Sequence, residues 1–432
     1  MPRLSPPTRR TRPFAQRGVA SLVVVMILFF ILALVAAYTN RNLIFEQRTA
    51  TNQYRSTQAL EAAQAGLEWA LAMLNSSRIT DACAPSLAIT DPTFRQRYLD
   101  IHPDTGMVQA KLQSDGVSTL MPSCVFDGSN WNCHCPADGN PVVAAPAGAG
   151  VFPAFRVRFL ASPAVKAGLV RIEVNGCTRL DDTCLNFPSA AVAGEGRASV
   201  QTYAALRSGL GAAPTAALTA RESIDLGRAA LAAFNTSTAT TGITILAGGA
   251  VNPAGLRLES HPGTPADTTL LAGDAALAAL SDERMFTNTF GALPAVYRQQ
   301  PAALRPPCTA GVCNATQVRD LAAINPGRVI WVEGDLSIDT GGDVGSPTEP
   351  LVLVVDGNLS FSLPVDVYGL VYSRSTNWSM SGPGRILGAA VAEGRVSGSA
   401  TTQIEYDRAV LNRLRFQTGS FVLVPGSWRD FE

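Results

Sequence analysis

The most prominent hydrophobic pattern is a 20-residue apolar run from Val19 to Tyr38, in which Ser21 is the only clearly polar residue. Twenty helical residues rise by roughly 30 Å, the thickness of the hydrocarbon core of a bilayer. Because a basic flank stays in the cytoplasm, the run predicts a membrane-spanning helix with the remaining chain exported. The 18 residues before the run contain no acid and five arginines, namely Arg3, Arg9, Arg10, Arg12 and Arg17.

Two kinds of cleaved signal are alternatives to this retained helix. An ordinary secretory signal has a shorter apolar core followed by small residues, and Val35-Ala36-Ala37 offers such a cleavage site. The pair Arg9-Arg10 is similar to a twin-arginine signal, although the apolar run is long for one. The length of the run favours a retained helix over both.

A helical pattern continues beyond the apolar run. Residues 39–75 contain no proline, and Gly66 is their only glycine. The pattern predicts one helix over 19–75, about 85 Å long, with its first third suited to lipid and its last third to packing on a domain. Two helices separated near Thr39-Asn40 are the alternative. Apolar residues at intervals of three and four form the predicted packing stripe: Leu60, Ala63, Leu67, Leu71 and Leu74.

Three later segments alternate between apolar and polar residues with a period of two, as strands with one buried face do. They cover residues 155–160, 169–174 and, more loosely, 198–206. An antiparallel sheet has one face to cover, and the apolar stripe of the preceding helix is the obvious cover. The sequence therefore predicts a helix lying on a small antiparallel sheet.

Beyond residue 221 short apolar runs alternate with Gly, Asp and Asn, and some of them repeat. Residues 332–338 recur as 355–361, offset by 23, and residues 369–372 recur as 388–391, offset by 19. A further short run, 393–397, resembles the first motif. Offsets of about 20 residues between strands that end in such turns predict the coils of a β-solenoid. An ordinary β-sandwich with similar hairpins is the alternative.

Together these patterns predict an α+β protein with a large all-β carboxyl-terminal domain. The expected segments are a leader over 1–18, a transmembrane helix over 19–75, a disulfide-pinned α/β head over 76–210, a linker over 211–220 and a β-rich domain over 221–432.

All the cysteines follow the apolar run, and an even number in an exported chain predicts disulfides. The close spacings predict two small loops, Cys177–Cys184 and Cys308–Cys313, and leave three ways to pair the other four. A zinc site at Cys133-His134-Cys135 is the alternative, but tetrahedral sites usually have two residues between cysteines. The eight candidates are Cys83, Cys124, Cys133, Cys135, Cys177, Cys184, Cys308 and Cys313.

The charge balance argues against a general affinity for nucleic acid. The chain has 34 basic and 34 acidic residues, and removing the five arginines of residues 1–18 leaves 29 against 34, a net charge near −5. A protein that grips the phosphate backbone needs the opposite balance. There is therefore no strong sign of nucleic-acid binding.

The residues Gln16-Arg17-Gly18-Val19-Ala20, the apolar run after them and residues 59–68 closely resemble the amino-terminal segment of PilX-type minor pilins of type IV pili. The resemblance implies that a prepilin peptidase cuts after Gly18 and that Val19 becomes the mature, N-methylated terminus. Major pilins carry glutamate at the fifth mature position, where this chain has Val23. Residues 325–332, 404–407 and 425–431 are similar to long PilX-like pilus assembly proteins.

The resemblance implies a minor pilin, and the bulk of the 221–432 domain predicts a low-copy position at the tip of the fibre or in the complex that primes its assembly. Its expected partners are other pilins and minor pilins, the prepilin peptidase, the inner membrane and a tip adhesin. Before assembly the amino terminus lies in the cytoplasm and the bulk in the periplasm, and after assembly the protein lies in the pilus at the cell surface. The alternative is a permanently anchored periplasmic binding protein or adhesin that never enters a pilus.

Catalytic motifs are missing from the sequence, which has no Gly-x-Ser-x-Gly elbow, phosphate loop or His-Glu-x-x-His helix. A β-solenoid enzyme that cuts polysaccharide is the alternative. Acids beside glycine more often make turns, and their spacing here does not match the calcium-binding EF-hand loop. We therefore predict no enzymatic activity, no cofactor and no metal. The acids that such an enzyme would use are Asp335, Asp339, Asp343 and Asp356.

Overall fold

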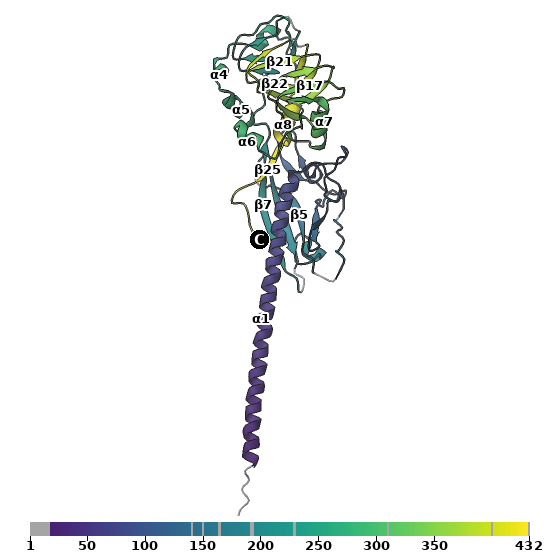
Figure 1. Ribbon diagram of the computed structural model, residues 1–432, viewed down its shortest axis with the longest axis vertical. Coiled ribbons are helices and arrows are strands. Elements are labelled where there is room, and N and C mark those ends of the chain that lie inside the picture. The colour runs from purple at the N-terminus through teal and green to yellow at the C-terminus, as the bar shows by residue number, and fades with distance from the viewer. Residues whose placement is uncertain are drawn as a thin grey trace, which may run out of the picture. The chain divides into compact units, whose positions relative to one another are not determined.

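The computed structural model describes residues 18–139, 141–148, 151–162, 166–190, 194–227, 230–308, 311–398 and 401–430. The chain divides into two compact units, one ending at Thr57 and the other covering Gln58–Glu432. Except for Gly18, the predicted leader lies outside the described residues. Figure 1 labels some of the elements used below.

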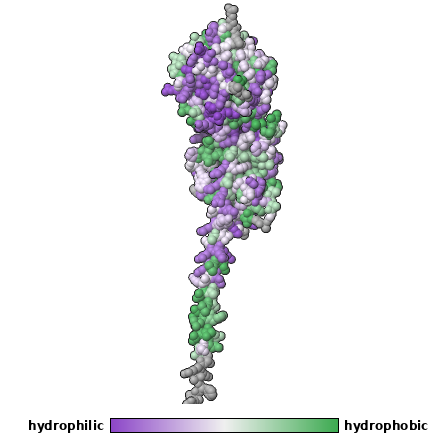
Figure 2. Space-filling view, viewed as in Figure 1, coloured by the Kyte–Doolittle hydropathy of each residue, from purple (hydrophilic) through white to green (hydrophobic). Residues whose placement is uncertain are grey.

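Helix α1 runs without a break over Gly18–Leu74, so the predicted single helix is confirmed and the break near Thr39-Asn40 is wrong. Thr39 does not interrupt the helix because its hydroxyl donates to the carbonyl of Val35, one turn back, at 2.8 Å. By length and composition α1 can cross a membrane, since its most apolar 18-residue window has a mean hydropathy of 3.0 and is fully exposed. Figure 2 shows its apolar side chains as a green band.

The last turns of α1 cover an antiparallel sheet, and both share one core. Ala63, Leu67 and Leu74 of the predicted stripe are buried there against Phe155 and Val174. The three predicted strands lie within β5, β6 and β7 and are confirmed. The strand order is β25-β7-β6-β5-β3-β4. The bounds are β3 Ser123–Phe126, β4 Trp131–His134, β5 Ala154–Ala161, β6 Leu169–Cys177, β7 Arg197–Ser208 and β25 Gly419–Leu423.

Short elements surround this sheet. Helix α2 begins after Thr93, whose side chain accepts from the amide of Gln96 while the Gln96 side chain accepts from the amide of Thr93. The chain then enters a two-stranded antiparallel sheet. The bounds are α2 Phe94–Tyr98, β1 Leu99–Ile101, β2 Val108–Ala110 and α3 Asp182–Leu185.

The carboxyl-terminal region consists of stacked parallel coils, so the predicted solenoid is confirmed and the β-sandwich is wrong. The repeats found in the sequence stack in register, because Leu336 pairs with Leu359 and Gly369 pairs with Gly388. One sheet has the order β12-β10-β24-β22-β20-β18-β16-β14, with β8, β11 and β13 beside it, and another has the order β15-β17-β19-β21-β23-β9. Between them lies a core that includes Leu353, Val371 and Trp378.

The bounds of the coil strands are β8 Leu218–Ala220, β9 Ile224–Asp225, β10 Ala232–Phe234, β11 Ile245–Ala247, β12 Arg257–Glu259, β13 Leu270–Leu271, β14 Ala303–Leu304, β15 Val312–Asn314, β16 Val329–Val332, β17 Asp335–Ile338, β18 Leu351–Val355, β19 Leu359–Phe361, β20 Asp366–Ser373, β21 Asn377–Ser381, β22 Arg385–Ala392, β23 Arg395–Ser397 and β24 Gln403–Tyr406.

Helices cover the outer face of the larger coil sheet. Phe286, Phe290 and Tyr297 pack with Trp331 and Tyr372 in an aromatic cluster, with ring centroids 4.4 to 6.5 Å apart. This cluster seals an apolar sheet face that would otherwise be exposed. The helices on this face are α4 Ala275–Ala278, α5 Asp282–Phe290, α6 Pro294–Arg298 and α8 Arg408–Gln417. Helix η1 Ala266–Thr269 lies beside β12 and β13, and α7 Ala315–Ile324 packs into the core between the two coil sheets.

After the coils the chain returns to the first sheet, where β25 pairs antiparallel with β7. The predicted range 221–432 therefore does not lie wholly in the coils, because β7 needs a partner strand and residues 419–423 supply it. The Asn75 side chain caps the outer edge of β25, since it accepts from the amide of Phe421 at 2.9 Å and donates to its carbonyl at 2.8 Å. A covered edge resists pairing with other chains.

Candidate functional site: the junction between α1 and the coils

The residues predicted to direct processing lie at the start of α1. Gly18 is the first helical residue. Val23 is 46% exposed and stands where major pilins carry glutamate. The first acid after Gly18 is Glu46, so the apolar part of α1 contains no carboxylate. Cleavage after Gly18 and methylation of Val19 stay predictions.

The structure contains disulfides, as the cysteine pattern predicted, and it pairs all eight cysteines. The two predicted small loops are closed by Cys177–Cys184 and Cys308–Cys313. The four cysteines whose pairing the sequence left open form the disulfides Cys83–Cys135 and Cys124–Cys133. Within the described residues no group of His, Cys, Asp and Glu is arranged to hold a metal ion.

Three of the four acids considered for a polysaccharide-cutting site have structural partners. Asp335 accepts from the amide of Asn358 in the next coil at 2.7 Å. Asp356 accepts from the indole nitrogen of Trp331 at 3.1 Å. The carboxylate of Asp343 accepts from the amide of Asp366 in the next coil at 3.4 Å. These contacts fit the expectation that acids beside glycine order the turns of the coils.

The carboxyl end of α1 has no basic residue of its own, and two arginines from other elements cap it. Arg95 Nε on α2 donates to the carbonyl of Leu74 at 3.1 Å. Arg328, just before β16, donates to the carbonyls of Asn75 and Ser76. The last carbonyls of a helix lack intrahelical partners and carry partial negative charge, so both arginines stabilise this end.

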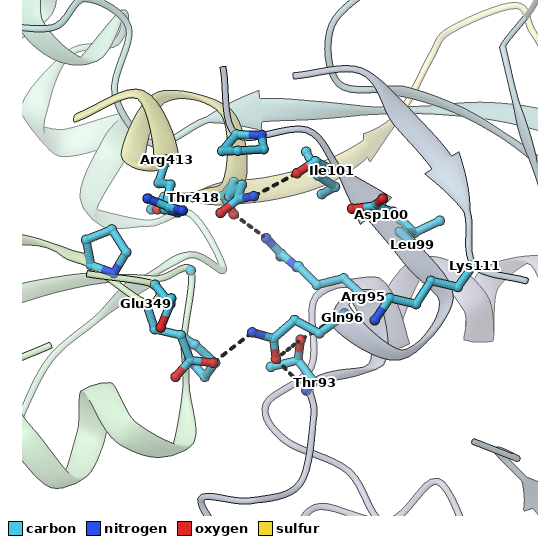
Figure 3. A pocket seen from close by; sticks show the side chains of 16 residues that line it. Thr93, Arg95, Gln96, Leu99, Asp100, Ile101, Lys111, Glu349, Arg413 and Thr418 are labelled. Atoms are coloured by element: carbon cyan, nitrogen blue, oxygen red, sulfur yellow. Dashed lines mark hydrogen bonds between the residues drawn. The ribbon is translucent and has the colours of Figure 1, made fainter. Parts of the chain in front are cut away.

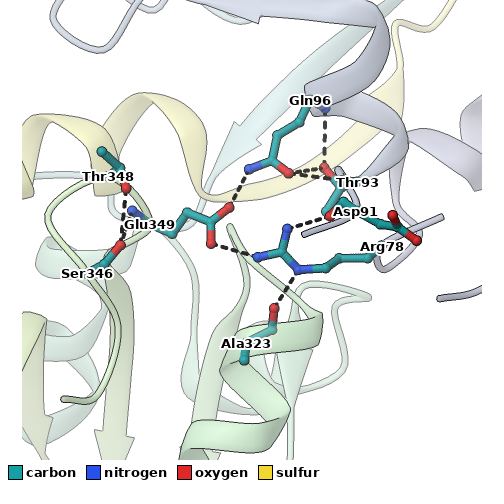
Figure 4. A network of polar contacts seen from close by, with 8 residues as sticks. All are labelled: Arg78, Asp91, Thr93, Gln96, Ala323, Ser346, Thr348 and Glu349. Atoms are coloured by element: carbon teal, nitrogen blue, oxygen red, sulfur yellow. Dashed lines mark hydrogen bonds and ion pairs between the residues drawn. The ribbon is translucent and has the colours of Figure 1, made fainter. Parts of the chain in front are cut away.

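A third arginine, Arg78, joins the segment after α1 to the coils (Figure 4). Its Nε donates to the carbonyl of Ala323 on α7 at 2.6 Å, and its Nη1 donates to the carbonyl of Asp91 at 2.7 Å. Its Nη2 forms an ion pair with Glu349 Oε2 at 2.7 Å. The other oxygen of Glu349 accepts from the side chain of Gln96 at 2.8 Å. One carboxylate therefore binds both the segment after α1, through Arg78, and helix α2, through Gln96.

The two capping arginines are buried, and neither forms an ion pair with a carboxylate of the described residues. Arg95 is 5% exposed, and its other acceptors are the carbonyls of Gln417 and Gly419. Burial, with a smaller contribution from the charge of Arg328, lowers the pKa of Arg95 to about 9. Burial lowers the pKa of Arg328 to about 10. Both guanidinium groups remain charged at neutral pH. The dipoles of the main-chain carbonyls offset most of the cost of burying their positive charge.

Two adjoining cavities open at this junction, with volumes of about 360 and 240 Å³. Pro326, Gly327, Glu349 and Pro350 line both of them. Figure 3 shows Arg95 crossing the larger cavity, with Gln96 reaching toward Glu349. Sequence reasoning missed this site, although the Thr93-Gln96 capping pair was a local signal for α2.

A second buried polar group lies on the coils beneath α5. Glu393, whose side chain is 2% exposed, accepts from the hydroxyl of Tyr372 at 3.0 Å and lies 3.6 Å from Arg374 Nε. Burial raises the pKa of Glu393 to about 7, and Arg374 and Tyr372 offset part of that shift. The carboxyl is therefore partly protonated at neutral pH.

Comparison with known proteins assigns the first part of the chain. The PilX N-terminal family model matches residues 17–68. No curated protein matches the chain. Among solved structures, the chain is similar to the competence-associated pilin ComZ from Thermus thermophilus, with 13% identity over 87% of this chain and 97% of that one and a TM-score of 0.21. A TM-score this low carries no argument about the role of this chain.

Proposed function

We propose, from the premise that residues 17–68 belong to the PilX N-terminal family, that this type IV pilin-like chain is a minor pilin. The observation that carries the proposal is the size of the unit attached to the pilin helix, Gln58–Glu432, which is 375 residues and includes the parallel coils. A subunit repeated along a thin fibre must fit between its neighbours. A unit of this size suits a rare position and a structural role without catalysis.

The proposed route to the pilus begins in the inner membrane. Helix α1 is apolar enough to anchor the precursor, with the 1–18 leader in the cytoplasm and the rest in the periplasm. A prepilin peptidase removes the leader at Gly18, and Val19 becomes the N-methylated terminus. Helix α1 then leaves the lipid and packs among the helices of other pilins, which are the expected partners.

The absence of an acid at Val23 supports a position at the tip. In related pilins a glutamate there compensates the terminal amine of a neighbouring subunit, and an unpaired charge in an apolar bundle costs several kcal/mol. A chain without this acid cannot accept a neighbour's amine, but it can offer its own. It therefore suits the end of the fibre, where it caps the pilus or primes assembly.

Mass spectrometry of sheared pili tests the assignment. We expect a low-copy chain whose first residue is Val19. The variant Gly18→Glu should leave a larger, unprocessed precursor, because the side chain blocks the peptidase. A mature terminus near Tyr38 would identify a cleaved signal peptide and refute the pilin assignment.

Immunogold labelling against residues 221–432 tests the position within the fibre. Labels should lie at fibre ends, and Val23→Glu should leave processing intact while reducing initiation. Regular labelling along the shaft would contradict the tip position but not the minor-pilin role. Complete absence from pili would favour the permanently anchored binding protein.

A further inference from the structure

The antiparallel sheet ends in two edge strands that differ in how they are covered. At one edge lies β25, where the side chain of Asn75 bonds to both the amide and the carbonyl of Phe421. At the other edge lies β4, which pairs only with β3 among the described strands. Native proteins usually cover or charge a sheet edge, because an open edge pairs with other chains. The open edge of β4 is therefore a candidate interaction surface.

Two main-chain amides of β4 face this open edge. The amide of Asp127 donates to the carbonyl of Asn130 at 3.0 Å, which makes these two residues a hydrogen-bonded pair. Pairs of an antiparallel ladder alternate, so the amides of Trp131 and Cys133 point away from β3. In the part of the chain that the structure describes, neither amide has a hydrogen bond across this edge. The two donors lie two residues apart, which is the repeat of an extended partner.

A cavity of about 570 Å³ lies along β4. Residues 142–146, all of them apolar, line it together with part of β4. Val142 is 78% exposed, and its amide donates to Nδ1 of His134 at 3.2 Å. Asp81 lines the same cavity, and its carbonyl accepts from the amide of Cys135 at 2.7 Å. The edge therefore already has one hydrogen bond of a further strand, and an apolar wall lies beside the two free amides.

We propose that the open edge of β4 binds an extended segment of another protein as an added strand, whose alternate side chains are apolar and face residues 142–146. The carbonyls of this segment accept from the amides of Trp131 and Cys133. Main-chain hydrogen bonds supply affinity in such strand addition, and alternate side chains supply specificity. Because Asp81 and residues 142–146 stand beside this edge, a single extended segment fits there better than the whole sheet of a second copy. The proposal goes beyond the minor-pilin role and does not depend on it.

Hydrogen exchange of the full chain in detergent tests the proposal. The probe is the neutral peptide acetyl-Ser-Thr-Val-Thr-Val-Thr-Ser-amide at millimolar concentration, and its control has proline in place of the central threonine, which interrupts a strand. The probe should slow exchange at the amides of Trp131 and Cys133 at least tenfold, and the proline peptide should leave both unchanged. No protection by the probe, or equal protection by both peptides, would overturn the proposal.

Two exposed valines connect the binding to this edge. Val142→Lys places a charge on the apolar wall and should weaken binding of the probe about tenfold or more in a calorimetric titration. Val117→Lys is the matched control and should bind like the parent, because Val117 is 81% exposed and does not line the cavity. Thermal melts would verify that both variants fold. Equal binding by the parent and both variants would refute the proposal. A dimer of the parent that Val142→Lys dissociates would assign the edge to a second copy and refute it as well.

Discussion

The antiparallel sheet under α1 and the parallel coils are stabilised in different ways. Three of the four disulfides, Cys83–Cys135, Cys124–Cys133 and Cys177–Cys184, lie in or beside the antiparallel sheet. The coils have one, Cys308–Cys313, which closes a loop at their first strand pair. In the coils each strand covers the next in register, so burial repeats from coil to coil. The sheet is instead covered by one helix and surrounded by long loops, which the disulfides hold in place.

Glycine also has a different role in each region. Gly176 on β6 lets α1 approach the sheet backbone directly, since a Cβ there would lie 2.5 Å from the amide nitrogen of Ala63. In the coils Gly369 and Gly388 pair in register with φ angles of +152° and +143°, which other residues rarely adopt. The sheet thus requires a close approach of the helix, whereas the coils require both a positive φ and a close approach of the neighbouring coil, since a Cβ on Gly369 would meet the carbonyl of Leu351.

The largest contrast should come from removing disulfides. The double substitution Cys83→Ser with Cys135→Ser opens a loop with a sequence separation of 52, whereas Cys308→Ser with Cys313→Ser opens one of 5. Loop entropy predicts a loss of about 4 kcal/mol for the first and about 2 kcal/mol for the second. Denaturant unfolding of the full chain would measure both, and equal losses would show that loop length does not decide the contribution.

Gly176→Ala should cost about 3 kcal/mol, because the helix backbone cannot move away without opening the core. Gly341→Ala is the matched control, since an added methyl group there meets nothing within 4 Å. Thermal melting and proteolysis would compare the two. If Gly176→Ala melts like Gly341→Ala, α1 does not pack on β6 as closely as described.

Arg328→Ala should cost about 2 kcal/mol, because it leaves the buried carbonyls at the end of α1 with fewer donors. Hydrogen exchange should increase at residues 75–78 and leave the coil strands protected. Arg319→Ala is the control, since Arg319 is only half-buried and bonds only to loop carbonyls, including that of Gly342. Faster exchange throughout the coils would mean that the junction supports the coils themselves.

At acidic pH the smallest effect should come from Glu393→Gln, because the carboxyl is then protonated and neutral, as the glutamine side chain is. The folded protein raises the pKa of Glu393 from 4.5 to about 7, so folding favours the protonated form. This contribution to stability is complete below pH 4.5 and is lost as pH rises through about 7.

The glutamine variant should therefore lose that pH dependence between pH 4.5 and 7 and melt above the parent at pH 8. Tyr372, Arg374 and Asp282 are the groups that act on this carboxyl. Thermal melts of both proteins across this pH range would measure the pH dependence of stability. An unchanged pH profile would show that Glu393 titrates normally.

The sequence by itself determined the features that leave a long periodic pattern in the chain. The apolar run and the stripe from Leu60 to Leu74 predicted α1, alternation predicted β5 to β7, and the offsets of 23 and 19 predicted the coils. Each signal works because periodic burial leaves a periodic pattern in the chain. The amino-terminal resemblance was likewise local, over residues 16–75.

Only the tertiary structure decided how these parts join. Arg78 reaches a carbonyl 245 residues away, Arg95 reaches one 324 residues away, and β25 pairs with a strand more than 200 residues before it. Their acceptors are mostly main-chain carbonyls, which every residue possesses, so no residue pattern marks them in advance. The junction arises because folding brings these arginines to one helix end, where unpaired carbonyls attract them.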